Sequence, residues 1–499
     1  MSGIAPYHKW IQSLIKAGNA NLKYLEEKAM RDYNDNPATC TILKFTTTGS
    51  VASSTIATAD DFQDAEVGQS RRLFLVEGFS QDSVENLGTA LDIEPEFFAS
   101  QLRATKWEHH DDRSDAMHLP YVRKQARFWT LEYLECIRLN GRYPLGRTRL
   151  LPWSPAIRRL HIRNPYKDQK ERYSVGLLTR LMSLWVKDAE NGNFDAVLLL
   201  DLPLKPQVEF EYDTVKPFET VSTSWSPYGG RFIDFAALGG RESLVERCPP
   251  DIGLGKSSLK EDLIWRLQNA ASFVVDGAPP VYVIPQLVAL SNWTLTLAFL
   301  RRDFYSLNTR DLTSDHATTE EVKAALNDLQ DCRSLLDRCN HQMWKNIRQL
   351  GLTPSDDGSV SPMSTDAKLP NHLLEDWIFI WRELRHWINE TDRLLDMRLA
   401  NLSILDSKRS RDDSKRAARI AADSAGITKL GQFLVFVYTP ASFAYGILSM
   451  GDEFLPGKSK FWVFFVVAIP LSLIIWFGLY LWVRLTSRRK CTSNSDVVV

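Results

Sequence analysis

The stretch Phe461–Val483 has the sequence FWVFFVVAIPLSLIIWFGLYLWV and contains no charged residue. A second uncharged run, Leu430–Gly451, ends nine residues before it. A helix of roughly 20 apolar residues is long enough to cross the hydrocarbon core of a bilayer, and both runs exceed that length. Two such runs joined by so short a loop are rare inside a globular domain. The sequence therefore predicts two membrane-spanning helices, 430–483 including their loop.

Basic residues flank this pair on one side. Lysines and arginines precede Leu430, four more follow Val483, and the loop Asp452–Lys460 balances two lysines against Asp452 and Glu453. Cytosolic loops carry an excess of Lys and Arg. We therefore expect an integral, multi-pass membrane protein with both termini in the cytosol and only the loop 452–460 on the far side.

The residues before the first run have the composition of a folded, water-soluble protein. Hydrophobic residues make up 44% of the chain and charged residues 24%, and the formal net charge is -1. This balance gives no general attraction to nucleic acid. The six cysteines form no CxxC pair, which argues against a zinc cluster or a disulfide-dense secreted domain. We expect no signal peptide, because the first 28 residues carry charges throughout.

A third uncharged run, Gly277–Leu300, differs from the other two. It contains three prolines near its start and several polar side chains further on. In lipid, the prolines would interrupt the helical hydrogen bonds and the polar groups would need partners. We therefore expect Pro285–Phe299 to be a buried helix of the soluble part.

Between 71 and 310 the pattern predicts a mixed α/β domain. The apolar run Ala196–Leu200 is typical of a strand covered on both faces. Other strands are expected at Arg71–Phe79 and Phe128–Ile137, and helices at Ser83–Leu91, Pro95–Leu102 and Tyr173–Val186. Residues 1–70 show no clear pattern beyond a helix near His8–Glu27, so they are expected to form a helical or irregular extension.

From 311 to 429 the chain is expected to form helices that lead to the first run. Thr318 and Glu321 form a capping box at the start of a helix that ends near Leu350. No proline lies between Pro370 and Pro440, so one helix has room to run from His372 into the first span. Its early part has a broad apolar face that is expected to pack on neighbouring helices: Leu373, Trp377, Ile380, Leu384, Trp387 and Leu394. Residues 484–499 form a basic tail.

Two stripes of small residues follow steps of three and four along this helix. The first is Ser407, Ser410, Ser414, Ala417, Ala421, Ser424 and Thr428. A helix with this face cannot have a hydrophobic core of its own, but copies of it could approach closely around an axis. The stepping continues through Thr428, Gly431, Val435, Thr439, Ser442, Gly446 and Ser449, with Tyr438 and Tyr445 as alternatives beyond Pro440. The second stripe either lines a water-filled path or packs tightly on another helix, because small and hydroxyl residues are typical of both environments.

Other motifs are weaker. Gly253–Ser257 lacks the first glycine of a phosphate loop, because Pro250 stands in its place. His109–Asp112 would need four adjacent side chains to point at one ion, and a solvated turn explains them better. No motif for covalent chemistry is present, so we expect no enzyme and no cofactor.

The loop after the first run resembles a known family. Ser449–Pro456 (SMGDEFLP) is similar to the region of CorA-type metal-ion transporters in which Gly-Met-Asn precedes a Phe-Glu-Phe-Met-Pro-like stretch. The matching residues are Met450, Glu453, Phe454 and Pro456. The segments LVEGFS and LDIEPEFFASQL within Leu75–Leu102 look like the fungal branch of the family.

The resemblance implies a CorA-like architecture: a cytosolic α/β domain, a long helical stalk and two spans in a homopentamer. It implies transport of a divalent cation, magnesium or zinc, with the pore-mouth motif at Ser449, Met450 and Gly451. The motif is degenerate here, because Gly451 replaces the family's asparagine. The zinc-exchanging ZntB branch of the family tolerates more variation in this motif. The alternative is a membrane-anchored scaffold or sensor that kept the fold without conduction.

Overall fold

The computed structural model describes the chain in blocks. In the first half these are residues 6–25, 38–46, 51–56, 71–78, 80–102, 126–140, 148–152, 157–163, 173–188, 193–203, 207–210 and 219–227. In the second half they are 258–269, 280–309, 319–354, 360–362, 371–449 and 456–493. Contacts divide the chain into two units, Met1–Ala400 and Asn401–Val499. The five parts expected from the sequence are a finer division, which these units do not test.

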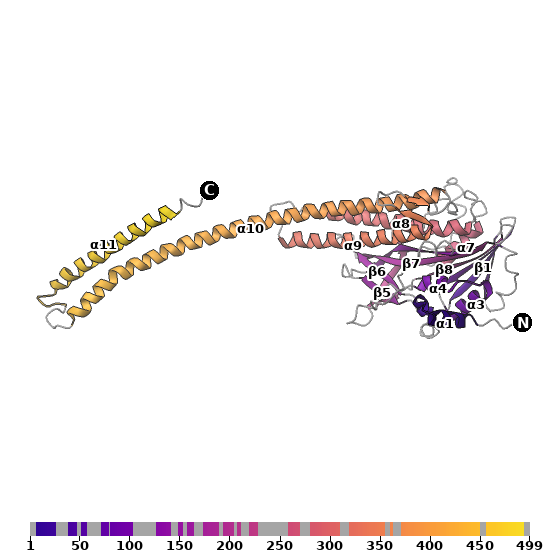
Figure 1. Ribbon diagram of the computed structural model, residues 1–499, viewed down its shortest axis with the longest axis horizontal. Coiled ribbons are helices and arrows are strands. Elements are labelled where there is room, and N and C mark those ends of the chain that lie inside the picture. The colour runs from indigo at the N-terminus through magenta and orange to yellow at the C-terminus, as the bar shows by residue number, and fades with distance from the viewer. Residues whose placement is uncertain are drawn as a thin grey trace. The chain divides into compact units, whose positions relative to one another are not determined.

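Ten of the described strands in the first unit form one mixed sheet (Figure 1). Its main path runs β2-β1-β3-β8-β7-β4-β10-β9, and β5 and β6 form a hairpin that pairs with β7. β3 and β8 are parallel, and the neighbouring pairs β1–β3 and β7–β8 are antiparallel. The strands are β1 Thr39–Phe45, β2 Val51–Ile56, β3 Arg71–Glu77, β4 Phe128–Asn140, β5 Thr148–Pro152, β6 Ile157–Arg163, β7 Tyr173–Asp188, β8 Phe194–Leu200, β9 Gln207–Phe210 and β10 Glu219–Pro227.

Helices cover the sheet and continue beyond it. They are α1 Tyr7–Lys16, η1 Ala20–Leu25, α3 Gln81–Leu91, α4 Pro95–Leu102, α7 Leu259–Asn269, α8 Pro280–Asn308, α9 Thr319–Gln349, α10 Asn371–Leu448 and α11 Trp462–Ser493. A small hairpin, β11 Leu352–Pro354 and β12 Val360–Pro362, lies between α9 and α10. α10 has 78 residues and belongs to both units.

The central strands are apolar on both faces because each face has its own layer of helices. Side chains alternate between the faces of a strand. Leu73 and Leu75 of β3 therefore pack with α8, α9 and the start of α10, and Phe74 and Val76 pack with α1, α3 and α4. Figure 1 shows the two groups of helices on opposite sides of the sheet. The prediction that Ala196–Leu200 is a strand covered on both faces is confirmed by β8, which is buried along its whole length.

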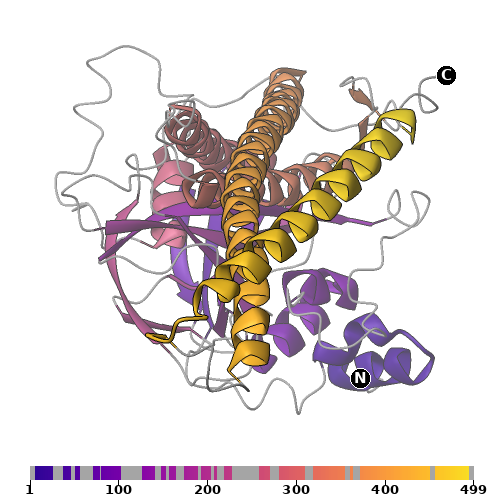
Figure 2. The ribbon, with the colours of Figure 1, turned by 90° about the vertical axis from the view of Figure 1, so that its left-hand side faces the viewer.

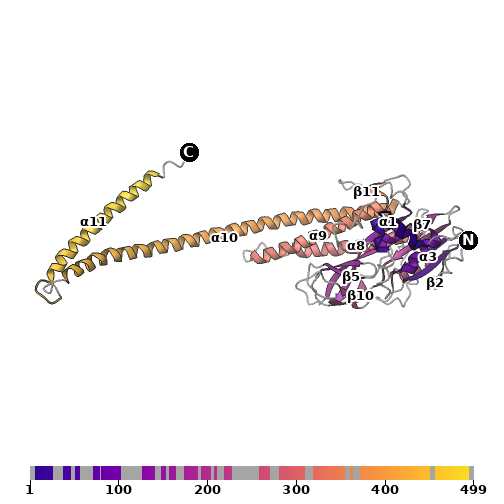
Figure 3. The same cartoon turned by 60° about the horizontal axis from the view of Figure 1, so that its bottom comes forward.

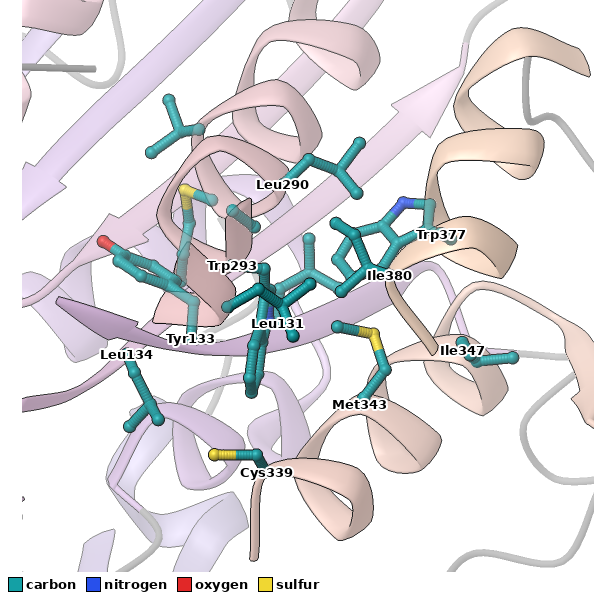
Figure 4. Packing of buried hydrophobic residues seen from close by; sticks show 14 of the residues in the cluster. Leu131, Tyr133, Leu134, Leu290, Trp293, Cys339, Met343, Ile347, Trp377 and Ile380 are labelled. Atoms are coloured by element: carbon teal, nitrogen blue, oxygen red, sulfur yellow. The ribbon is translucent and has the colours of Figure 1, made fainter. Parts of the chain in front are cut away.

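α8 is the buried helix that joins the sheet to α9 and α10. Trp293 is fully buried, and its indole nitrogen donates to the carbonyl of Glu132 on β4 at 3.3 Å. The indole of Trp377 on α10 donates to Gln286 on α8 at 3.3 Å. Figure 4 shows Trp293 and Trp377 among apolar side chains from β4, α8, α9 and α10. The apolar face expected on the early part of α10 is confirmed, since Leu373 and Leu384 are completely buried.

By length and composition, Val281–Asn308 is the one described helix that could cross a membrane. In its most apolar window 72% of the residues are buried in the structure. Three of the polar residues that made a span at Pro285–Phe299 unfavourable are buried, namely Gln286, Ser291 and Thr296. Thr296 donates to the carbonyl of Leu134 at 3.1 Å. The expectation of a buried helix of the soluble part is therefore confirmed.

Most other expected elements are also confirmed. They are the strands at 71–77 and 128–140 and the helices at 81–91, 95–102, 319–349 and from 371. Glu321 lies in the first turn of α9, and its capping partner Thr318 lies outside the described residues.

The prediction of a helix at Tyr173–Val186 is wrong. The segment is β7, which pairs antiparallel with β4 along thirteen residues and with β8 along seven. Leu177, Leu181 and Leu184 have helix-like spacing, but all residues from 174 to 186 are buried. Burial on both faces removes the polar alternation that identifies a strand. The sequence also missed β1 and β2, which join the same sheet through β3.

A buried ion pair links the two parallel strands. Arg72 and Asp195 are register partners on β3 and β8, and the Nε of Arg72 donates to Oδ1 of Asp195 at 2.7 Å. Their side chains are 2% and 1% exposed. Removing one partner of such a pair leaves a charge in an environment that solvates it poorly.

We predict that Arg72→Met lowers the free energy of unfolding by about 3–5 kcal/mol, because Asp195 stays buried without its guanidinium. Arg72→Met combined with Asp195→Leu should recover most of that loss, since neither charge is then desolvated. Guanidinium-induced unfolding of the full chain in detergent, followed by tryptophan fluorescence, measures both. Equal losses in the single and double variants would contradict this account of the pair.

Candidate functional site

The second unit contains most of the exposed large hydrophobic side chains among the described residues. On α10 these include Leu434, which is 55% exposed, and Tyr438, which is 75% exposed. On α11 they include Ile474 at 69% and Phe477 at 64%. Water-soluble monomers rarely leave a continuous apolar surface of this size uncovered, and such surfaces mark contact with lipid or with protein.

The apolar part of α11 is its first half, Trp462–Gly478. α11 turns back after the end of α10, and the two helices diverge from the turn (Figures 2 and 3). The described part of the turn, Pro456–Lys460, includes Gly457 at φ 96°, a left-handed conformation that glycine adopts without strain. Met450, Gly451, Asp452 and Glu453, four of the residues expected at the pore mouth, lie outside the described residues.

All seven residues of the expected pore-lining stripe are exposed: Thr428, Gly431, Val435, Thr439, Ser442, Gly446 and Ser449. No atom lies within 4 Å of where a Cβ would stand on Gly431 or Gly446. Within one chain, this stripe therefore makes no close packing contact at its glycines.

Two hydroxyl groups on the stripe, those of Thr428 and Ser449, are hydrogen-bonded to the helix itself. Thr428 Oγ1 donates to the carbonyl of Ser424 at 2.8 Å, and Ser449 Oγ donates to the carbonyl of Gly446 at 3.0 Å. A hydroxyl oxygen that donates its proton to the backbone keeps its lone pairs for another partner. The stripe therefore presents acceptor oxygens at its surface, the type of group that a hydrated cation approaches.

The stretch of α10 before the stripe is exposed on every side. Each residue from Asp406 to Gln432 is exposed, including the small-residue seam from Ser407 to Thr428. Its charged groups form weak, solvated pairs, such as Lys415 with Asp412 at 3.7 Å. Helices gain most of their stability from packing. A segment of this length that is exposed to solvent among the described residues is therefore expected to pack against something else.

Among the described residues, no group of three or more His, Cys, Asp or Glu side chains is arranged to hold a metal ion. The weaker sequence candidates, His109–Asp112 and Gly253–Ser257, lie outside those residues. No sequence pattern singles out Glu77, a buried carboxyl at the end of β3, because an acidic residue after an apolar strand is common.

No protein-family model matches the chain. No curated protein matches it either. Among solved structures, similar chains include the full-length CmaX protein, which is 9% identical. That match covers 90% of this chain and 98% of the other, with a TM-score of 0.30. A likeness at this level does not decide fold or function.

We predict that the small-residue seam of α10 contacts the same seam of other copies. In a background with Cys248 and Cys491 replaced by serine, Ser414→Cys should form disulfide-linked dimers on mild oxidation in membranes. Arg416→Cys, two residues away on the far side of the helix, should not. Non-reducing gel electrophoresis separates the products. Efficient cross-linking through Arg416→Cys but not Ser414→Cys would place the contact on the opposite face.

Proposed function

We propose that the protein is a CorA-like cation channel or transporter that conducts a divalent cation, magnesium or zinc, through a homopentamer. The observation that carries the proposal is the exposed stripe of small and hydroxyl residues on α10, which leads directly to the Ser-Met-Gly-Asp-Glu-Phe segment at its end. Lipid-facing helix surfaces are normally apolar, so a stripe of this composition needs another partner.

The membrane lies across the end of α10 and the start of α11. The exposed apolar side chains of both helices support this placement, and so do the lengths of the uncharged runs 430–451 and 461–483. With basic residues before the first span and after the second, both termini are cytosolic. The α/β domain then lies in the cytosol, and the chain needs no nucleic acid or cofactor.

Several copies assemble with the small-residue seams of α10 around a common axis. The complete exposure of Asp406–Gln432 in the single chain supports this arrangement, because neighbouring copies would supply the missing packing partner. The resemblance to the CorA family sets the number of copies at five. The bilayer covers the remaining apolar surface.

Conduction requires no bond to be made or broken. A divalent cation loses its water reluctantly, and magnesium usually keeps several waters when protein binds it. Asp452 and Glu453, repeated around the ring, raise the cation concentration at the far mouth. Hydroxyl and backbone oxygens along the stripe then replace or orient part of the hydration shell. At Gly451 only the backbone carbonyl is available to the ion, since the family's asparagine amide is missing.

The glycine at position 451, in place of the family's asparagine, favours a second candidate, a non-conducting membrane-anchored scaffold or sensor. Purified protein in liposomes loaded with a magnesium-sensitive or zinc-sensitive dye distinguishes the two. Metal-dependent dye signals above those of empty liposomes support transport. Oligomers that form normally but conduct neither metal would support the scaffold instead.

We predict that Ser442→Leu abolishes most of the metal flux while the protein still assembles. The change adds a leucine to the stripe in each subunit, so it narrows the path from all sides. Leu434→Ala, on a surface expected to meet lipid, should keep flux within about twofold of the unchanged protein, a loss worth less than 0.5 kcal/mol. Stopped-flow dye fluorescence measures flux, and size-exclusion chromatography measures assembly. Flux that survives Ser442→Leu and fails in Leu434→Ala would show that the path lies on another face of α10.

We predict that Asp452→Asn combined with Glu453→Gln lowers flux at low metal concentration. The loss should be several-fold at low ionic strength and smaller near physiological salt, because salt screens the attraction between the ring and the cation. At saturating metal the two proteins should conduct alike. Flux that does not change at low salt and low metal concentration would rule out this role for the loop carboxylates.

A further inference from the structure

Glu77 occupies an unusual place for an acidic residue. It is the last residue of β3, and its neighbours in register are Thr39 on β1 and Leu200 on β8. The side chain is 7% exposed, and Oε1 is buried with no hydrogen-bond partner among the described residues. Burying an ionised oxygen without a donor is costly, so such groups usually have a reason to be there.

The first turn of α7 covers this carboxyl. Ser258 caps the helix: its hydroxyl accepts from the backbone nitrogen of Glu261 at 3.2 Å, and its own nitrogen donates to the Glu261 carboxylate at 3.3 Å. Lys260 Nζ donates to Thr39 Oγ1 at 2.6 Å, which ties the same turn to the strand beside Glu77. The first turn of α7 therefore lies at the carboxyl end of β3.

Beyond its first turn, the described contacts of α7 join it to the hydrophobic core and to β2. Leu263 and Leu267 are 1% and 2% exposed and belong to the hydrophobic core, and Gln268 donates to Ser53 on the edge strand β2 at 3.1 Å. The two polar ties to β1 and β2 are solvent-exposed. Solvent-exposed hydrogen bonds such as these open more easily than buried ones, so they do not hold α7 firmly against a local opening.

The charges around Glu77 come from two elements. Lys260 and Glu261 approach from α7, and Arg180 from β7. Burial raises the pKa of Glu77; Lys260, a hydrogen bond from Ser258 and Arg180 lower it in part, and Glu261 raises it. On β1, the buried thiol of Cys40 also faces Lys260, and burial raises the pKa of that thiol to about 12, so it stays neutral.

We propose that Glu77 and the first turn of α7 form a proton-sensitive latch, in which α7 stays docked while the Glu77 carboxyl is neutral and lifts when it ionises. A neutral carboxyl suits the buried position, because its proton satisfies one oxygen and Oε1 carries no charge. An ionised carboxylate needs water or another donor at Oε1. Water reaches that oxygen only when the first turn of α7 moves away.

The direction of the pH dependence follows from where the proton binds more tightly. The docked state has the raised pKa, so it binds the proton more tightly than the released state, in which Glu77 has an ordinary pKa. Docking is therefore strongest at low pH. It weakens as the pH rises from the ordinary value through the docked-state pKa, by up to about tenfold in the docking equilibrium for each pH unit.

Hydrogen exchange of the full chain in detergent, read by mass spectrometry between pH 5 and pH 8, tests the latch. After correction for the intrinsic rate, protection of the peptide covering residues 259–269 should fall as the pH rises, while peptides from α9 keep theirs. In Glu77→Gln the protection of α7 should no longer depend on pH. Glu320→Gln, which changes an exposed carboxyl on α9, should keep the original profile.

Lys260→Met separates the latch from a merely structural role of Glu77. Loss of the lysine raises the docked-state pKa further, so the fall in protection should extend to higher pH. A structural tie lost with Lys260 would lower protection at every pH without moving the profile. Protection of α7 that does not change with pH in the unaltered protein, or that changes equally in Glu77→Gln, would overturn the proposal.

Discussion

Apolar surface must be covered, and the two units of this chain meet that requirement in different ways. In Met1–Ala400 the chain covers itself, with helices on both faces of one sheet and α8 at the centre of the larger core. In Asn401–Val499 large apolar side chains of α10 and α11 remain exposed. Burying such side chains is worth about 25 cal/mol for each Å² removed from water, so this surface has a strong tendency to meet lipid or protein.

α10 connects these two situations within one helix. Its first turns are anchored in the core by Leu373, Trp377 and Leu384, and Arg333 on α9 pairs with Asp392 at 2.5 Å. From Asp406 to Gln432 it is exposed all round, and beyond Leu430 its sequence becomes apolar. One continuous helix therefore passes through environments that demand different residues, and its sequence changes accordingly. Any signal between the two units would have this helix as its covalent path.

The sequence predicted elements best where one physical environment applied along the whole element. β8 and the buried face of α10 are such cases, since β8 is a short continuous apolar run and the apolar residues of α10 follow the helical period. β7 was misassigned because side chains on both of its faces are buried, which leaves leucines at helix-like intervals and no polar alternation. β1 was missed because a short strand with Thr39 and Lys44 among its residues has a weak pattern, and its place in the sheet depends on pairing with β3.

The candidate pore stripe could be predicted from local spacing, whereas the buried charged groups could not. Steps of three and four predict that Thr428, Ser442 and Ser449 share one side of a helix, and all three are exposed, because the α-helical period is a local property. The buried pair of Arg72 with Asp195 and the covered carboxyl of Glu77 could not be foreseen in this way. Their partners lie more than 100 residues away in the sequence, and Asp195 and Ser258 meet them only when β3, β8 and α7 come together. The apolar runs, the helical period and the small-residue faces can all be identified from local sequence. Which charged groups become buried depends on tertiary packing, because desolvation depends on what surrounds a residue in the folded chain.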